Sequence, residues 1–88
     1  MRVGIDLVRI SEIRDAMSRR ERFRTRLFSD AEVRFCDARG NPSQHYAARF
    51  ALKEAFFKAT GYRGAWREVE VVPGAGGAPA LRVAGVDC

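Results

Sequence analysis

The chain has 88 residues, which corresponds to one small domain near the lower size limit for independent folding. Hydrophobic residues make up 47% and charged residues 31%, a globular balance that argues against intrinsic disorder. The net charge of +5 favours an anionic partner, such as nucleic acid, nucleotide phosphates or an acidic protein.

The apolar runs and the cysteines bear on the location of the protein. No apolar run approaches the roughly 20 residues that span a bilayer, so we expect no membrane association. The first ten residues, MRVGIDLVRI, contain Asp6 and lack the long apolar region of a secretory signal. Cys36 and Cys88 match neither a disulfide framework nor a zinc pattern, so we expect reduced thiols and a cytoplasmic protein.

The first predicted elements are a strand and a helix. Residues 2–8 alternate between two faces and predict a β-strand, although Asp6 is unusual there because aspartate is disfavoured in strands. Residues 10–23 predict a helix with an apolar side. The residues of that side are Ile10, Ile13 and Met17. Three more apolar residues are expected to pack where the chain then turns: Phe23, Leu27 and Phe28.

Two further helices are marked by their ends. Ser29 and Glu32, three residues apart, form a capping box that opens a short helix through about Ala38. A third helix is predicted over residues 42–60, because proline suits its first position and Gly61 suits the residue after its end.

The last part of the chain predicts a hairpin. Residues 67–72 and 80–85 read as two strands that a glycine-rich connection joins. The element order predicts an α+β fold in which three helices pack on a small, mainly antiparallel sheet, within a single domain of residues 1–88. An open two-stranded edge favours association with another chain.

The third helix carries unexpected charges. It is apolar nearly all round, which predicts a central position. Glu54 nevertheless lies on a stripe that is otherwise aromatic, where an unpaired carboxylate would be costly. The same helix holds both lysines of the chain, Lys53 and Lys58, whereas the other basic residues are 14 arginines. A compact, strongly hydrated ammonium suits an anion site; two ordinary surface lysines are the alternative.

Asp6 and Glu54 are two acids at positions that folding rules disfavour. A shared cation would resolve both, and two carboxylates without histidine or thiolate suit Mg²⁺, which also accepts phosphate oxygens. Lys58, one turn beyond Glu54, would neutralise the same phosphate. Pairing of the two acids with arginines is the alternative.

Three segments together resemble the holo-acyl-carrier-protein synthases, which are small bacterial 4′-phosphopantetheinyl transferases. They are GIDLV at 4–8, ERFRTRLFSDAEVRFC at 21–36 and NPSQHYAARFALKEAFFKATG at 41–61. The resemblance implies an enzyme that transfers 4′-phosphopantetheine from coenzyme A, the co-substrate, to a serine of apo acyl carrier protein, with Mg²⁺ as cofactor. It also implies a homotrimer, with the site between subunits, and a role in fatty acid and lipid biosynthesis.

The resemblance assigns roles to particular residues. Asp6 and Glu54 take the positions of the Mg²⁺ ligands, and Glu54 also accepts the serine proton, directly or through water. The positions that resemble coenzyme A-binding residues are Arg49, Lys53, Lys58 and Pro79. Lys58 is expected to contact the phosphates and to offset charge during catalysis, and Pro79 to lie near the adenine end.

Acyl carrier proteins are acidic, which suggests a use for the arginines of the first helix region. Residues 14–26 hold six arginines against two acids. Arg20, Arg22 and Arg26 lie at or beside the family's carrier-facing positions, so we expect them to dock the carrier. A merely solvated helical face is the alternative.

The chain departs from the family pattern at several points. Arg9 and Glu12 exchange the usual order of acid and base, and Phe57 replaces a serine that is common in the family. The S-x-S-H or S-x-T-H motif is not found, so we expect the closing strands of the family to be missing, and His45 to be exposed. A catalytically impaired relative that only binds acyl carrier protein or coenzyme A is therefore the alternative function. We do not expect nucleic acid binding, because the spacing of Phe23, Phe28 and Tyr62 fits core packing better.

Overall fold

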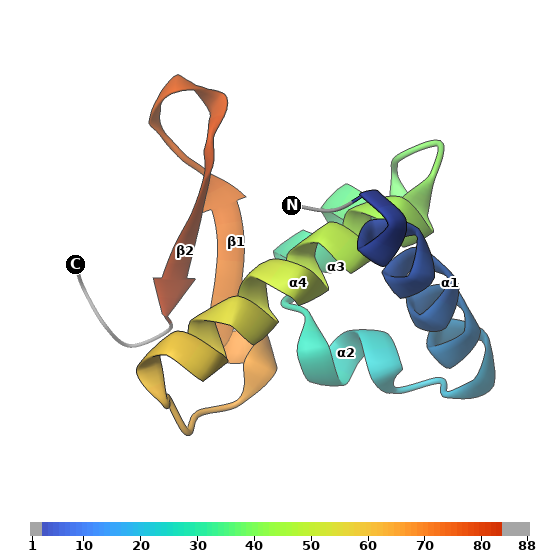
Figure 1. The fold of residues 1–88 in the computed structure, drawn as a ribbon, viewed down its shortest axis with the longest axis horizontal. Coiled ribbons are helices and arrows are strands. Elements are labelled where there is room, and N and C mark those ends of the chain that lie inside the picture. The colour runs from blue at the N-terminus through green and yellow to red at the C-terminus, as the bar shows by residue number, and fades with distance from the viewer. Residues whose placement is uncertain (1–2, 84–88) are drawn as a thin grey trace.

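The fold is described by a computed structural model that covers the backbone of residues 3–83 and the side chains of residues 10–74 and 76–83 (Figure 1). The helices are α1 (Val3–Arg19), α2 (Phe23–Leu27), α3 (Asp30–Asp37) and α4 (Pro42–Thr60), with 3₁₀ turns η1 (Trp66–Glu68) and η2 (Ala75–Gly77). The strands are β1 (Val69–Pro73) and β2 (Pro79–Val83). The α+β class is confirmed, with helices packed on a small antiparallel sheet.

Helix α4 occupies the centre of the molecule. It contacts α1, α3 and β1, and Figure 1 shows α1 near one of its ends and the hairpin near the other. Its predicted bounds are confirmed: Pro42 opens the helix, and Gly61 follows it with φ of 68°, a left-handed conformation that glycine adopts without steric cost. The Gly61 N–H donates to the carbonyl of Phe57 at 2.9 Å and closes the last turn.

The hairpin is also confirmed. Strands β1 and β2 pair antiparallel, with Val69 opposite Val83 and Val71 opposite Leu81. Val69 and Val71 are buried, whereas the outer strand β2 is more exposed. One face of β1 therefore closes the core beside α4.

The strand predicted at residues 2–8 is wrong, because α1 begins at Val3. A strand needs a neighbouring strand to satisfy its backbone N–H and C=O groups, whereas a helix satisfies them internally. Within residues 3–83 the sheet contains β1 and β2 alone, so this segment has no strand to pair with. The three expected helices are also joined by a fourth, the five-residue α2.

The capping box at the start of α3 is confirmed in both directions. The Ser29 hydroxyl accepts a hydrogen bond from the Glu32 N–H at 3.2 Å, and the Glu32 carboxylate accepts one from the Ser29 N–H at 2.9 Å. These bonds satisfy backbone donors that the first turn of a helix leaves unpaired. They fix where α3 starts relative to the preceding helix α2.

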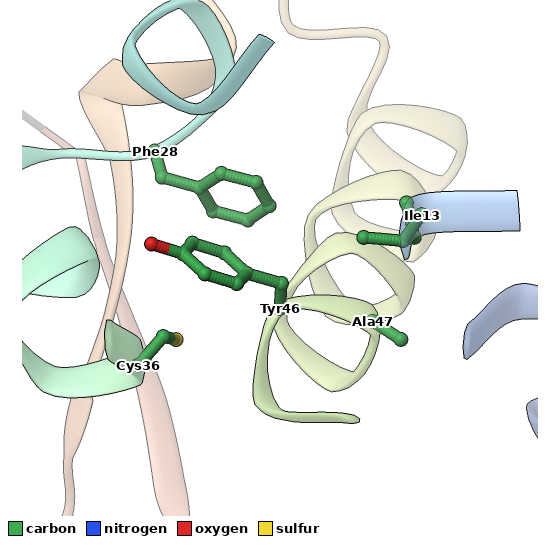
Figure 2. Close-up of a cluster of buried hydrophobic side chains, with 5 residues drawn as sticks. All are labelled: Ile13, Phe28, Cys36, Tyr46 and Ala47. Atoms are coloured by element: carbon green, nitrogen blue, oxygen red, sulfur yellow. The ribbon is translucent and has the colours of Figure 1, made fainter. Parts of the chain in front are cut away.

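The main core lies between α1, α3 and α4 (Figure 2). Its buried residues are Ile13, Phe28, Cys36, Tyr46 and Ala47. The rings of Phe28 and Tyr46 meet edge to face, with centroids 4.9 Å apart, and the Tyr46 hydroxyl donates to Asp37 at 2.7 Å. The predicted packing of Ile13 and Phe28 is confirmed. None of the helices within the described residues has the length and apolar character needed to cross a membrane.

Candidate functional site

The two lysines of α4 occupy opposite environments, and Lys53 is the buried one. Its side chain is 0% exposed, and its Nζ donates to the Leu27 carbonyl at 2.6 Å, to Glu32 Oε1 at 2.6 Å and to the Trp66 carbonyl at 3.1 Å. An ammonium has three hydrogens, so this arrangement leaves none for a phosphate. Contact between Lys53 and coenzyme A would require the network to open.

The carboxylate opposite Lys53 is just as enclosed. Glu32 is 1% exposed at its side chain, and its second oxygen accepts the N–H of Val71 on β1 at 2.9 Å. Burial lowers the pKa of the Lys53 ammonium, while the Glu32 carboxylate opposes that shift. This pair was missed by the sequence analysis, which recognised Glu32 only as a cap and placed Lys53 beside Arg49.

Lys58 and Glu54 form the second, more open pair of α4. Lys58 Nζ lies 3.8 Å from Glu54 Oε2, and the two side chains are 76% and 27% exposed. One helical turn separates them, so both side chains lie on the same face. The structure thus brings together the two residues expected to be catalytic, with the ammonium directed to solvent, where it can meet a phosphate.

A hollow of about 790 Å³ lies between α3, α4 and the β1–β2 hairpin. We call it the hairpin groove, and its lining includes Phe35, Arg49, Leu52, Val72, Pro79 and Arg82. Two of the four residues expected to bind coenzyme A, Arg49 and Pro79, therefore line one groove. Leu52 and Phe35 supply exposed apolar surface beside them.

Cationic groups gather at the groove around one aromatic ring. The guanidinium of Arg49 lies 4.3 Å from the centroid of the Phe35 ring, and that of Arg39 lies 3.9 Å from the same centroid. The Nε of Arg49 is buried and has no hydrogen-bond partner among the described residues. Two like charges near one ring favour an anion between them. His45 packs edge-on against Phe35 and is half-buried, which corrects the expectation that it is exposed.

The groove and the Glu54–Lys58 pair lie on different sides of α4. Arg49 and Glu54 are five residues apart, which corresponds to about 140° around an α-helix, and Arg49 and Lys58 are separated by about 180°. Neither Glu54 nor Lys58 lines the hairpin groove. A single chain therefore divides the expected site residues between two surfaces.

The metal site can be tested in part. Among the described residues, no three histidine, cysteine, aspartate or glutamate side chains gather in a group that would hold a metal. Mg²⁺ often takes only one or two protein carboxylates and completes its shell with water and substrate phosphates, so the partly exposed Glu54 fits as a ligand. Asp6 lies on α1, which packs against α4, but its side chain is outside the described part of the structure.

The arginines expected to meet a carrier converge on a second hollow of about 240 Å³. We call it the arginine hollow, and Arg20, Arg22, Phe23, Arg26 and Leu27 line it. All three arginines are exposed, as is Glu12 on α1. The side chain of Arg9, the other half of the exchanged pair, is outside the described residues.

Phe57, which replaces the family's serine, has an apolar role. Its ring stacks on that of Trp66 with centroids 5.0 Å apart and an interplanar angle of 13°. Phe50 also packs on Trp66, at 4.9 Å. Phe57 thus fixes the end of α4 against η1.

Comparison with known proteins matches residues 2–87 to the 4′-phosphopantetheinyl transferase superfamily. A holo-[acyl-carrier-protein] synthase of Desulforudis audaxviator is 46% identical over 87 residues, covering 94% of this chain and 66% of the relative. One of Moorella thermoacetica is 40% identical over 82 residues (90% and 64%), and one of Anaeromyxobacter dehalogenans is 42% identical over 89 residues (96% and 70%). The chain thus spans about two thirds of the length of these relatives. No solved structure matches it.

Proposed function

We propose a function from one premise: this chain belongs to the 4′-phosphopantetheinyl transferase superfamily. Its function is to transfer 4′-phosphopantetheine from coenzyme A to a serine of an apo acyl carrier protein, as a holo-[acyl-carrier-protein] synthase. Identity of 40–46% with relatives of that name supports this assignment. The structural observation that carries it is the Glu54–Lys58 pair, an acid and an exposed ammonium on one face of the central helix.

The chemistry follows from the roles of these two side chains. The serine oxygen forms a bond to the β-phosphorus of coenzyme A, and the bond from that phosphorus to the bridging oxygen breaks. Adenosine 3′,5′-bisphosphate leaves, and the serine proton passes to Glu54 directly or through a water. Lys58 offsets the negative charge that develops on the phosphate oxygens, since such transfer depends mainly on positioning and charge.

The proposal includes a Mg²⁺ ion held by Asp6 and Glu54. When bound, it would neutralise charge on the diphosphate of coenzyme A. Titration calorimetry of coenzyme A with and without Mg²⁺ tests the assignment. Asp6→Ala should remove the Mg²⁺-dependent part of the binding while leaving the fold intact, and unchanged Mg²⁺ dependence in this variant would contradict it.

The hairpin groove is the proposed seat of the nucleotide end of coenzyme A. Arg49 supplies a buried guanidinium without a partner among the described side chains, and Pro79 supplies an apolar edge beside it. Because the groove and the Glu54–Lys58 pair lie on different sides of α4, a site shared between neighbouring copies would unite them. We therefore propose a homotrimer in which the groove of one copy faces the pair of the next.

The proposed acceptor docks at the arginine hollow. Three exposed arginines surround an apolar floor of Phe23 and Leu27, a combination that suits an acidic partner with a few apolar side chains. An acyl carrier protein has this character. The setting we propose is the cytoplasm, in fatty acid and lipid biosynthesis.

The test is a mass-shift assay. Apo acyl carrier protein is incubated with the chain, coenzyme A and Mg²⁺, and its mass is expected to increase by one phosphopantetheine. Lys58→Met and Glu54→Gln should abolish the increase, whereas Arg34→Gln, a change at an exposed residue of α3, should not. No mass increase with folded wild-type protein would overturn the transferase assignment, and calorimetry would then test a chain that only binds.

A further inference from the structure

The buried network around Lys53 joins the parts of the molecule that carry the two proposed binding surfaces. Its acceptors come from the end of α2 (Leu27), from α3 (Glu32) and from η1 (Trp66). Glu32 extends the network to β1 through the N–H of Val71. One ammonium on α4 therefore contacts three other segments directly and a fourth through its partner.

The first of these contacts reaches the arginine hollow. Leu27 lines the hollow with its side chain, and its carbonyl oxygen lies 2.6 Å from Lys53 Nζ. Helix α2 has only five residues, none of them buried, so its own packing holds it weakly. The bond to Lys53, together with the bond from Arg67 to the Thr25 carbonyl at 2.7 Å, attaches α2 to the rest of the domain.

The other end of the network is the catalytic helix. Lys53 directly precedes Glu54 in α4, and Lys58 follows one turn later. A residue held from three directions fixes both the rotation and the axial position of the helix that carries it. A change at Lys53 would thus move Glu54 and Lys58 relative to α2.

We propose that Lys53 is a positioning residue: it sets the placement of Glu54 and Lys58 relative to the arginine hollow where the carrier docks. The meaning of these two surfaces rests on the proposed function. Lys53 touches neither substrate in this role. It determines whether a serine delivered by the docked carrier arrives in line with the phosphate.

The test must separate positioning from stability. Lys53→Met alone leaves the Glu32 carboxylate buried and unpaired, so it damages the fold in either case. The double variant Glu32→Gln/Lys53→Met removes both charges and retains a side-chain oxygen for the Ser29 N–H. Thermal melting and circular dichroism establish that it is folded before any kinetic measurement.

For positioning, the folded double variant should lose at least roughly tenfold in kcat, while KM for coenzyme A and for the carrier change little. A merely structural role would leave kcat at the wild-type value once the fold is restored, and that result would overturn the proposal. If the double variant does not fold, Arg67→Gln loosens α2 at an exposed position without burying a charge. It should then lower kcat in the same way, and an unchanged kcat would again contradict the proposal.

A readout independent of turnover distinguishes this inference from the proposed function. Trp66 is the only tryptophan, and its carbonyl accepts from Lys53. Titration with an apo acyl carrier protein should change Trp66 fluorescence in the wild type but not in the double variant, although both bind it. If the wild type transfers nothing, the transferase assignment fails while this comparison still decides the role of Lys53: equal fluorescence changes in both proteins would overturn it.

Discussion

The Nζ atom of Lys53 lies 2.6 Å from Oε1 of Glu32, and neither side chain is more than 1% exposed. On the same helix, Lys58 Nζ lies 3.8 Å from Glu54 Oε2 with 76% of its side chain exposed. Both contacts are ion pairs between lysine and glutamate. Their different burial assigns them different work, because solvent screens one pair and not the other.

This difference predicts how the same substitution acts at the two lysines. Lys53→Met should destabilise the fold by about 3–5 kcal/mol, because it leaves a buried carboxylate without its counter-charge. Lys58→Met, the matched control, should cost less than about 1 kcal/mol, as is usual for exposed pairs. Urea unfolding of both variants measures the two values, and equal costs would show that the burial of Lys53 has no energetic consequence.

Signals that act within one turn of the chain predicted the fold well. Ser29 and Glu32 gave the start of α3, and a proline and Gly61 gave the ends of α4, because caps and breakers act through adjacent backbone groups. The pair of Lys53 and Glu32 joins residues 21 apart in sequence, so no pattern within one turn indicates it. Its only sequence signal was a lysine inside an otherwise apolar helix.

The misassigned strand shows an ambiguity of short patterns. Residues 3, 5 and 7 alternate as in a strand, yet Val3, Leu7 and Ile10 also recur at helical spacing, in phase with Ile13 and Met17. A segment with two compatible periods takes the structure for which partners exist. The division of the site over two sides of α4 was missed for a related reason, since motif resemblance gives residues and not the faces they share.

The cap at Ser29 should contribute more at neutral pH than in acid. Its hydroxyl accepts from the Glu32 N–H and donates to Glu70 Oε2 at 2.7 Å, and this second bond, with help from Arg82, lowers the pKa of Glu70. A depressed carboxyl pKa adds stability above the unfolded value of 4.5 that is lost as the pH falls through the folded pKa.

Ser29→Ala should therefore cost about 1–3 kcal/mol at pH 7 and less near pH 3. Ser18→Ala is the control, because the Ser18 hydroxyl makes only an exposed bond to the Asp15 carbonyl, and it should have little effect. Thermal melts at both pH values measure the difference. A cost that does not change with pH would mean that Glu70 is not coupled to the cap.

Alkaline pH should destabilise the fold through Cys36. Its side chain is fully buried, and burial raises the pKa of the thiol from 9.0 to about 11, with Arg49 opposing the shift. Between these values the unfolded thiol loses its proton while the folded thiol keeps it, so the folded state binds more protons and stability falls as the pH rises.

Cys36→Ala should remove this contribution, so its free energy of unfolding should fall less steeply above pH 9, by up to about 1.4 kcal/mol per pH unit. Tyr46, whose pKa burial also raises, and Lys53, whose pKa is lowered, give slopes of opposite sign that both proteins share. The difference between the two curves therefore isolates Cys36. Parallel curves from pH 8 to 10.5 would contradict the raised thiol pKa.

The division of the site over two faces predicts complementation between inactive variants. Arg49→Ala disables the hairpin groove and Lys58→Ala disables the exposed pair, so each should be inactive alone. Mixed in equal amounts and allowed to exchange subunits, they should recover about one quarter of wild-type activity, because a ring of heterologous interfaces combines an intact groove with an intact pair at that frequency. A site contained within one chain would recover nothing, and light scattering of the same mixture reports whether an oligomer forms at all.

Carrier docking should depend on salt and on the charge of α1. If the exposed arginines of the arginine hollow attract an acidic carrier, affinity should fall steeply with salt, since exposed charges are screened within about 8–10 Å at physiological ionic strength. Glu12 is exposed on α1 and opposes that attraction, so Glu12→Arg should raise the on-rate by roughly two- to tenfold at low salt. The gain should shrink as salt is added, and the off-rate should change little because no packed contact is altered. Arg22→Gln, which removes one charge from the hollow, should act in the opposite direction, and stopped-flow measurements at 50 and about 500 mM salt compare all three proteins. Rates that depend on neither the substitutions nor the salt would leave these arginines as a solvated surface, and the carrier would then have to dock elsewhere.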